Sequence, residues 1–146
     1  MLTLSSACGG DKGTGPSNAD PTGTYTLRSV DDHSLPATIH QGPWLDSVSV
    51  RFYNLYVVRV LQGSFSLDDD GRFYIAIGGQ VNADGAVWSP TSSMQGDYQI
   101  EDGELWIKPD GLPVWPTPAQ IHDGVIELPI DLMSKGVANV FEFRRS

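Results

Sequence analysis

The sequence predicts an all-β domain, an antiparallel up-and-down meander of about 8–10 short strands that closes into a barrel. Two observations carry this prediction: apolar and polar residues alternate with the two-residue period of half-buried strands, and Asp-Gly turns separate the alternating runs. The 16 Gly and 10 Pro also leave few helix-forming runs. An open β-sandwich is the alternative, but closure into a barrel removes the two unpaired sheet edges.

One hairpin pattern occurs twice, in residues 62–75 and 95–107. Each copy begins with Gln-Gly, continues as an alternating strand, turns at Asp-Gly and alternates again. The first copy is one residue longer in its turn. A three-residue loop at residues 69–71, with Gly in the left-handed conformation, then places Leu67 opposite Phe73.

The second copy turns at residues 102–103, where Asp-Gly suits a two-residue type I′ loop. The same reasoning applies to a third hairpin that turns at residues 123–124. In both, apolar residues face each other only if the loop has this length, which supports the assignment. The expected facing pairs are Ile100 with Leu105 and Ile121 with Ile126.

The other strands follow the same period. A Gly-x-aromatic-x-aliphatic motif opens three of them, at residues 23–27, 63–67 and 96–100. Apolar residues hold even positions from Val50 to Val60, Phe52 included, and odd positions from Phe65 onwards, so we expect a β-bulge near Gly63. Prolines exclude residues 110–118 from a central strand, and residues 137–143 supply the last one.

Length, charge and composition limit the classes of fold and function that this chain can have. A chain of 146 residues forms one domain with a core of its own. A formal net charge of −9 argues against a nucleic-acid partner, because phosphates would be repelled. No stretch approaches the ~20 apolar residues of a membrane-spanning helix.

The N-terminal residues carry a separate signal. The sequence Ser-Ser-Ala-Cys-Gly-Gly places the only cysteine, Cys8, after small residues and before a Gly-rich polar stretch. This arrangement resembles the end of a bacterial lipoprotein signal peptide, in which the cysteine carries the lipid. We therefore expect residues 1–8 to be the remnant of such a signal, 9–20 a flexible tether and 21–146 the barrel domain. The alternative for Cys8 is a free thiol.

Taken with the Gly-Thr-Tyr-Thr-Leu opening strand, the two Asp-Gly hairpins and the Phe-x-Phe-Arg-Arg end, the chain resembles the lipocalin-like bacterial lipoproteins. That resemblance implies a lipid-anchored barrel in the bacterial cell envelope, at the periplasmic face of the outer membrane or the cell surface. It also implies a non-catalytic binding module for a small apolar ligand. Lipocalin-like barrels often pack a final-strand basic residue over the opening aromatic, which here pairs Arg145 with Tyr25. An interaction or inhibitor-type lipoprotein with a filled barrel is the alternative, and a protein partner would then replace the ligand.

No catalytic motif, metal-ligand spacing or cofactor signature is present, so we expect neither an enzyme nor a cofactor. A hydrolase assembled from scattered residues is the alternative. The acidic run at residues 68–71 is interpreted as solvated turn residues; calcium binding is the alternative. Aromatic side chains are the remaining candidates, and Trp88, Trp106 and Trp115 are the expected ligand-binding residues. The alternative is that they cover the barrel ends as satellite core.

Overall fold

The computed structural model describes residues 20–111 and 118–146, and all regular secondary structure within them is β-strand. Alternating side chains and tight turns give strands of 2 to 17 residues. The strands are β2 (Gly23–Val30), β3 (His33–Ser34), β4 (Ala37–Asp46), β5 (Arg51–Leu67), β6 (Arg72–Ala83), β7 (Ala86–Trp88), β8 (Thr91–Glu101), β9 (Glu104–Pro109), β10 (Ala119–His122), β11 (Val125–Ile130) and β12 (Asn139–Arg145).

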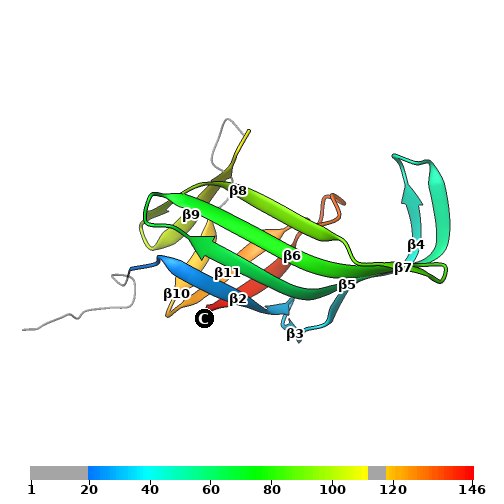
Figure 1. The fold of residues 1–146 in the computed structure, drawn as a ribbon, viewed down its shortest axis with the longest axis horizontal. Coiled ribbons are helices and arrows are strands. Elements are labelled where there is room, and N and C mark those ends of the chain that lie inside the picture. Colours follow the sequence, from blue (N-terminus) through cyan, green and yellow to red (C-terminus); the bar gives the residue numbers. More distant parts are fainter. Residues whose placement is uncertain (1–19, 112–117) are drawn as a thin grey trace, which may run out of the picture.

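Eight strands close into an antiparallel barrel in the order β2, β12, β11, β10, β9, β8, β6, β5 and back to β2 (Figure 1). The first and last strands of the domain are hydrogen-bonded neighbours, with Tyr25 opposite Arg145. On its other side β2 pairs with β5, where Tyr25 lies opposite Phe65. These two pairings confirm the predicted closure and exclude the open sandwich.

The hairpin turns have the predicted lengths and registers. Gly71 has φ of 84°, and Leu67 lies opposite Phe73. Asp102 and Gly103 have φ of 53° and 78°, as a type I′ turn requires. The facing pairs are Ile100 with Leu105 and Ile121 with Ile126.

The change of parity in β5 also has the predicted cause. The register of β5 against β6 shifts between Val60 and Gln62, so one extra residue, Leu61, re-aims the side chains that follow. Val60 and Phe65 are therefore both fully buried, although one is even-numbered and the other odd.

Beyond the bulge, β5 and β6 continue past the barrel and pair with two added strands. This part, called the extension, comprises β4, the turn at residues 47–50, residues 51–60 of β5, residues 79–83 of β6, and β7. In Figure 1 it lies at the end of the molecule opposite the N-terminal strand start. The chain thus makes an excursion through β3 and β4 between two strands that are neighbours in the barrel.

The predicted inward orientation of Val50 and Phe52 is wrong. Val50 is 80% exposed and Phe52 57% exposed. β5 begins only at Arg51, and a further register shift follows, where one residue of β4, Pro43, opposes two of β5, Asn54 and Leu55. The shift turns Tyr53 and Tyr56 to the same side, and the carboxylate of Asp84 accepts the freed backbone N–H groups of Asn54 and Leu55 at 3.1 and 2.8 Å.

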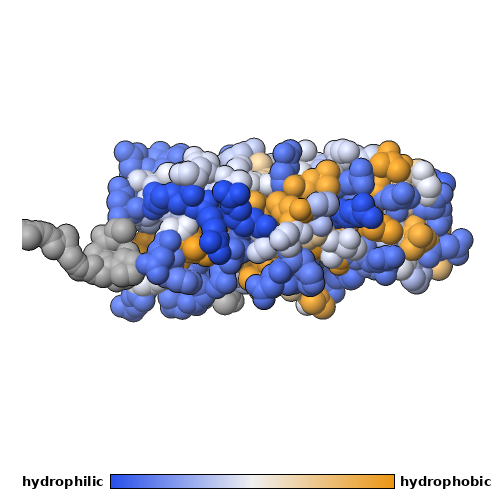
Figure 2. Space-filling view, turned by 90° about the horizontal axis from the view of Figure 1, so that it is seen from below, coloured by the Kyte–Doolittle hydropathy of each residue, from blue (hydrophilic) through white to orange (hydrophobic). Residues whose placement is uncertain are grey.

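The two ends of the molecule differ chemically. The turns at residues 68–71, 102–103 and 123–124 lie at the barrel end where β2 begins, since Gly23 pairs with Leu67. Each of these turns contains Asp. Exposed large apolar side chains gather instead on the extension, and Figure 2 shows apolar residues mainly over that half of the face in view. They include Leu45, Val48, Val50, Phe52, Leu55, Val87 and Trp88.

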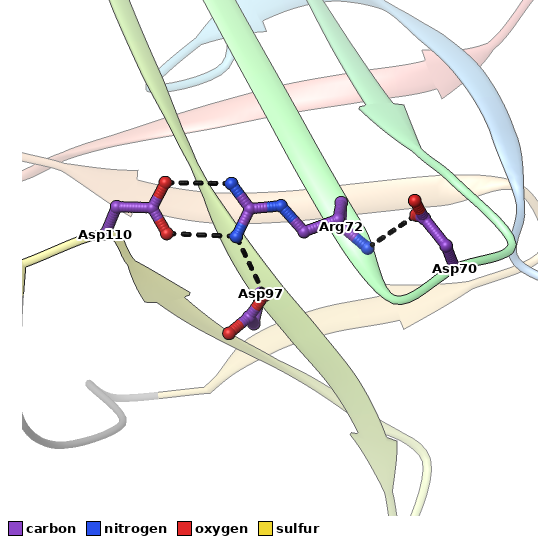
Figure 3. Close-up of polar contacts among 4 residues, drawn as sticks. All are labelled: Asp70, Arg72, Asp97 and Asp110. Atoms are coloured by element: carbon purple, nitrogen blue, oxygen red, sulfur yellow. Dashed lines mark hydrogen bonds and ion pairs between the residues drawn. The ribbon is translucent and has the colours of Figure 1, made fainter.

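An ion-pair cluster ties three strands together near the acidic turns (Figure 3). The Arg72 guanidinium donates two parallel hydrogen bonds to the Asp110 carboxylate, at 3.0 and 2.8 Å, and one to Asp97 at 2.8 Å. The Arg72 backbone N–H donates to Asp70 at 3.2 Å. The hydrogen bonds from Arg72 hold the pKa of Asp110 below its ordinary value. Every acid in the cluster accepts a hydrogen bond from Arg72. The role of the cluster is therefore to position the start of β6.

Candidate functional site

Side chains fill the middle of the barrel. Five aromatic residues are at most 2% exposed, and Phe65 packs edge-on against Phe143 with ring centroids 5.4 Å apart. An eight-stranded barrel is just wide enough for its own side chains, so such large residues occupy the interior. The five are Tyr25, Phe65, Phe73, Phe141 and Phe143.

A cleft of about 220 Å³ lies where the barrel opens onto the inner face of the extension. One wall is the sheet, with Val58 and Val81 at its floor, both at most 8% exposed. The opposite wall comes from the loop between β11 and β12. Its lining residues are Trp44, Tyr56, Val58, Arg59, Ile77, Gly79, Val81, Pro90, Ser92, Leu132 and Met133. The lining is thus mainly apolar and aromatic, as is usual for small-molecule sites.

Stacked aromatic rings form one side of the cleft. The Trp44 and Tyr56 rings stack with centroids 5.7 Å apart and planes 19° from parallel. Tyr56 is also in contact with the rings of Tyr53, at 5.2 Å, and Trp88, at 6.4 Å. Burial raises the pKa of the Tyr56 hydroxyl, which therefore stays neutral at physiological pH. A preordered aromatic surface binds a planar or apolar ligand at low entropic cost.

His40 completes this aromatic group from β4. Its ring meets Trp44 edge-on at 5.3 Å, and its Nδ1 lies 3.0 Å from the Lys135 ammonium. Its Nε2 is buried without a hydrogen-bond partner among the described residues. Lys135 also lies 5.6 Å from the centre of the Trp44 ring, in cation–π geometry. The loop is therefore fastened to the aromatic group by one basic side chain.

The loop that carries Lys135, residues 131–138, is held in shape by Asp131. The Asp131 carboxylate accepts the backbone N–H groups of Lys135 at 2.8 Å and Gly136 at 2.6 Å. Leu132 packs against the barrel core and Met133 against Val58 and its neighbours on the extension. An ordered turn thus fixes the second wall of the cleft.

A second depression of about 570 Å³ lies on the outer wall of the barrel near the bulge. Its lining contains no aromatic and no charged side chain; it comprises Thr26, Leu27, Leu35, Leu61, Gln62, Gly63, Ser64, Ala76, Gly78 and Thr91. It is larger than the cleft but offers nothing that would orient a ligand. The cleft is therefore the candidate site.

The structure separates the tryptophans that the sequence singled out. Trp88 lies on β7, 42% exposed, and reaches the aromatic group through Tyr56. Trp106 lies on β9, opposite Gln99 of β8, and does not line the cleft. Trp115 and Cys8 lie outside the described residues. Of the two predicted binding residues that the structure describes, Trp88 therefore belongs to the site's surroundings and Trp106 does not.

The barrel-closing contact between Tyr25 and Arg145 is present. The Arg145 guanidinium carbon lies 5.0 Å from the Tyr25 ring centre, and the guanidinium donates to the Tyr25 hydroxyl at 2.8 Å. Arg145 also donates to the backbone carbonyls of Asp20 and Thr22, at 2.8 and 2.6 Å. One arginine thus closes the barrel end opposite the cleft and fixes the start of β2.

Sequence reasoning missed most of the cleft. The sequence identifies Trp44 as an aromatic residue and places Tyr56 in a strand. Their stacking, however, depends on the register shift between β4 and β5. Met133 and Lys135 come from a loop about 90 residues further along the chain than Trp44. The mixture of Met, Leu and Lys in residues 131–138 was the one available signal, and it has no periodicity.

No protein-family model matches this chain, and neither a curated protein nor a solved structure matches it. Within residues 20–111 and 118–146, no group of three or more His, Cys, Asp or Glu side chains could hold a metal ion. The same part of the chain contains no helix long and apolar enough to span a bilayer.

Proposed function

We propose that this protein is a non-catalytic binding module, anchored by a lipid in the bacterial cell envelope, that holds a small apolar ligand in the cleft. The observation that carries the proposal is the stacked Trp44–Tyr56 pair beside the buried Val58 and Val81. Such a lining gains energy by covering apolar ligand surface, at roughly 25 cal/mol per Å². The cleft volume of about 220 Å³ is below that of drug-sized sites and favours a small ligand.

The packing of the barrel interior favours the cleft over the core as the position of the proposed ligand. Phe65 and Phe143 are 0% exposed and in direct ring contact. Close-packed interiors admit a ligand only by displacing side chains, which costs several kcal/mol. This arrangement supports a binding module in which the barrel is the scaffold and the ligand binds outside the barrel core.

Native mass spectrometry of the protein purified from its own envelope tests the proposal directly. We expect a bound small molecule in the wild type and in Trp106→Ala, whose site lies on β9 away from the cleft. Trp44→Ala should lose the molecule, because it removes the stacked face. Equal retention by both variants, or loss only in Trp106→Ala, would contradict the cleft as the site.

A second candidate is an interaction lipoprotein that binds a protein partner through the extension. The observation that favours it is the exposed apolar tip, where Val48 is 93% and Val50 80% exposed. Exposed apolar clusters are typical of interaction surfaces. Val48→Ser would then abolish partner binding and leave small-molecule binding unchanged, whereas Trp44→Ala would do the reverse.

The lipid anchor is supported by the Ser-Ser-Ala-Cys-Gly-Gly sequence around Cys8. Expressed behind a complete lipoprotein signal, the wild type should fractionate with membranes and Cys8→Ala should not. Acyl labelling of the wild type would identify the modification. A Cys8→Ala variant that stays in the membrane fraction would exclude Cys8 as the anchor.

A further inference from the structure

We propose that the tip of the extension docks on the surface of a lipid bilayer by inserting its apolar side chains. The tip is the end of the β4–β5 hairpin, residues 44–53, which projects as two strands because β6 pairs with β5 only as far as Tyr56. In Figure 1 this hairpin stands apart from the barrel strands. The inference goes beyond the proposed ligand binding and does not depend on it.

Exposed apolar side chains cover the turn and the outer face of the tip. Val48, in the turn, is 93% exposed. Leu45 and Phe52 lie opposite each other on neighbouring strands and are 62% and 57% exposed. An exposed apolar cluster of this kind marks a surface that contacts something other than water.

Val50, the last residue of the turn, holds a backbone conformation that valine rarely adopts. Its φ is 55°, in the left-handed region, where a β-branched residue is strained. Within the described residues, every other non-Gly residue at positive φ is Asp or Ser. Such strain at an 80% exposed position indicates that the apolar side chain itself is used.

The order of side chains along the tip matches the layers of a bilayer surface. Tyr53 lies opposite Trp44 and about 10 Å along the strand from Val50, at ~3.3 Å per residue. The exposed apolar side chains are all nearer to the turn than this aromatic pair. Elements that lie in a membrane interface bury their apolar side chains roughly 5–10 Å deep. Trp and Tyr are enriched at the level of the headgroups, where the pair would then lie.

Asp46 satisfies the polar groups of the turn from within the hairpin. Its carboxylate accepts the Ser49 hydroxyl at 2.8 Å and the backbone N–H groups of Val48 and Ser49 at 3.0 and 3.4 Å. The turn therefore presents fewer bare N–H groups, which would be costly away from water. The same hydrogen bonds, that of the Ser49 hydroxyl first, hold the pKa of Asp46 below its ordinary value. The charged carboxylate limits the docking to a shallow depth.

The charge distribution favours a bilayer of low net charge. The tip contains one acid and one base, Asp46 and Arg51, which lie opposite each other. The formal net charge of −9 therefore resides entirely in the rest of the chain. An anionic surface would repel that remainder, whereas a zwitterionic surface leaves the apolar contact unopposed.

Lipid fits the tip better than a protein partner does. The apolar side chains continue from the outer face around the turn to the aromatic pair on the other face, so a protein would have to enclose the hairpin. Lipid adapts to this shape without a preformed socket. The proposed anchor permits the contact, because residues 9–20 between Cys8 and the domain span up to about 40 Å when extended.

Vesicle flotation of the full-length Cys8→Ala protein tests the docking without any contribution from the proposed lipid. We expect this protein to bind vesicles of phosphatidylcholine alone. Replacing about a third of the lipid by phosphatidylglycerol should weaken the binding at low salt, because the acidic remainder of the chain is repelled. Added salt should restore it.

Variants in the same Cys8→Ala background locate the contact. Val48→Ser combined with Val50→Asn should reduce vesicle affinity about tenfold or more, because two apolar side chains are lost. Its thermal midpoint should not fall, since Asn tolerates positive φ. Val48→Leu should raise the affinity about threefold to fourfold through its added methylene group. Val140→Ser is the matched control, because it removes a 44% exposed valine from β12 of the barrel, and it should change nothing.

The contrary outcomes are equally specific. Failure of the Cys8→Ala protein to bind phosphatidylcholine vesicles, or equal binding by the double variant, would overturn the inference. Binding that requires phosphatidylglycerol and is lost in salt would overturn it as well. Weaker binding by Val48→Leu would indicate a shaped protein site instead of lipid. The double variant keeps Trp44 and Tyr56 and should retain the small molecule in native mass spectrometry, so the docking and the cleft proposals fail separately.

Discussion

Gly96 has no room for a side chain, and Gly96→Ala should be the most damaging single methyl addition in the barrel wall. A Cβ built there would lie 2.7 Å from the Pro109 Cα and 2.9 Å from the Lys108 carbonyl carbon. The closest atom is the Lys108 carbonyl oxygen. Ordinary van der Waals contact begins at 3.4 Å, so β8 and β9 must separate by more than the 0.7 Å (3.4 Å less 2.7 Å) that the Pro109 Cα alone requires. The obstacle is backbone, which cannot rotate away as a side chain can.

The expected cost follows from two terms. Forcing an extra methyl group into a packed position costs roughly 1–3 kcal/mol, and about two ladder hydrogen bonds weakened between β8 and β9 add about 1 kcal/mol each. We therefore expect Gly96→Ala to lower the free energy of unfolding by about 3–5 kcal/mol. Urea titration followed by tryptophan fluorescence and far-ultraviolet circular dichroism measures it.

Gly78→Ala is the matched control, since Gly78 also lies in a barrel strand. A Cβ there would meet only the side chain of Gln62, at 3.1 Å, and that exposed chain can move. Its free energy of unfolding should stay within about 1 kcal/mol of the wild type. If the two alanine variants differ by less than about 1 kcal/mol, close backbone approach is not the reason for glycine at position 96.

Three further predictions concern the turns and the ion pairs. Gly71→Val should lower the free energy of unfolding in urea by roughly 1–3 kcal/mol, because a β-branched residue is strained at a φ of 84°. A loss no larger than that of Asp69→Ala would disprove this turn assignment. A double-mutant cycle of Tyr25→Leu with Arg145→Gln should give a coupling energy of about 0.5–2 kcal/mol, and a value of zero would show that the contact is not a cation–π interaction of consequence. Since the pKa of Asp110 is lowered in the folded state, its stabilisation is present above the ordinary carboxyl value of 3.8 and is lost as the pH falls through the lowered value. The stability difference between wild type and Asp110→Asn should therefore shrink below about pH 4, and a difference that grows on acidification would reverse the assigned sign.

Local pattern predicts the barrel well because strand register depends on short-range constraints. A turn of known length fixes which residues of a hairpin face each other, and a slip by one residue would expose a whole apolar face. Turn length alone therefore predicts the facing pairs Leu67 with Phe73 and Ile100 with Leu105. The bulge at Leu61 was predictable for the same reason, because the apolar positions change from even to odd between Val60 and Phe65.

The candidate site depends on information that no local pattern contains. Phe52 obeys the same alternation as Val58 in the sequence, yet it is 57% exposed, because the register shift between Tyr53 and Tyr56 turns it to the exposed face of the sheet. Whether an alternating strand residue is buried depends on what packs against the sheet. For the cleft that partner is the 131–138 loop, and the chain between them gives no hint of the contact.

The long strand β5 determines how the two ends of the molecule can be used. It has 17 residues and spans about 55 Å at ~3.3 Å per residue. The chain enters the domain at Gly23, opposite Leu67 at one end of β5, whereas Tyr56 of the cleft lies 11 residues earlier, about 35 Å along the strand. The proposed lipid on Cys8 would therefore join the domain through its acidic end and not through the cleft end. The cleft end of the molecule would then stay accessible to a ligand.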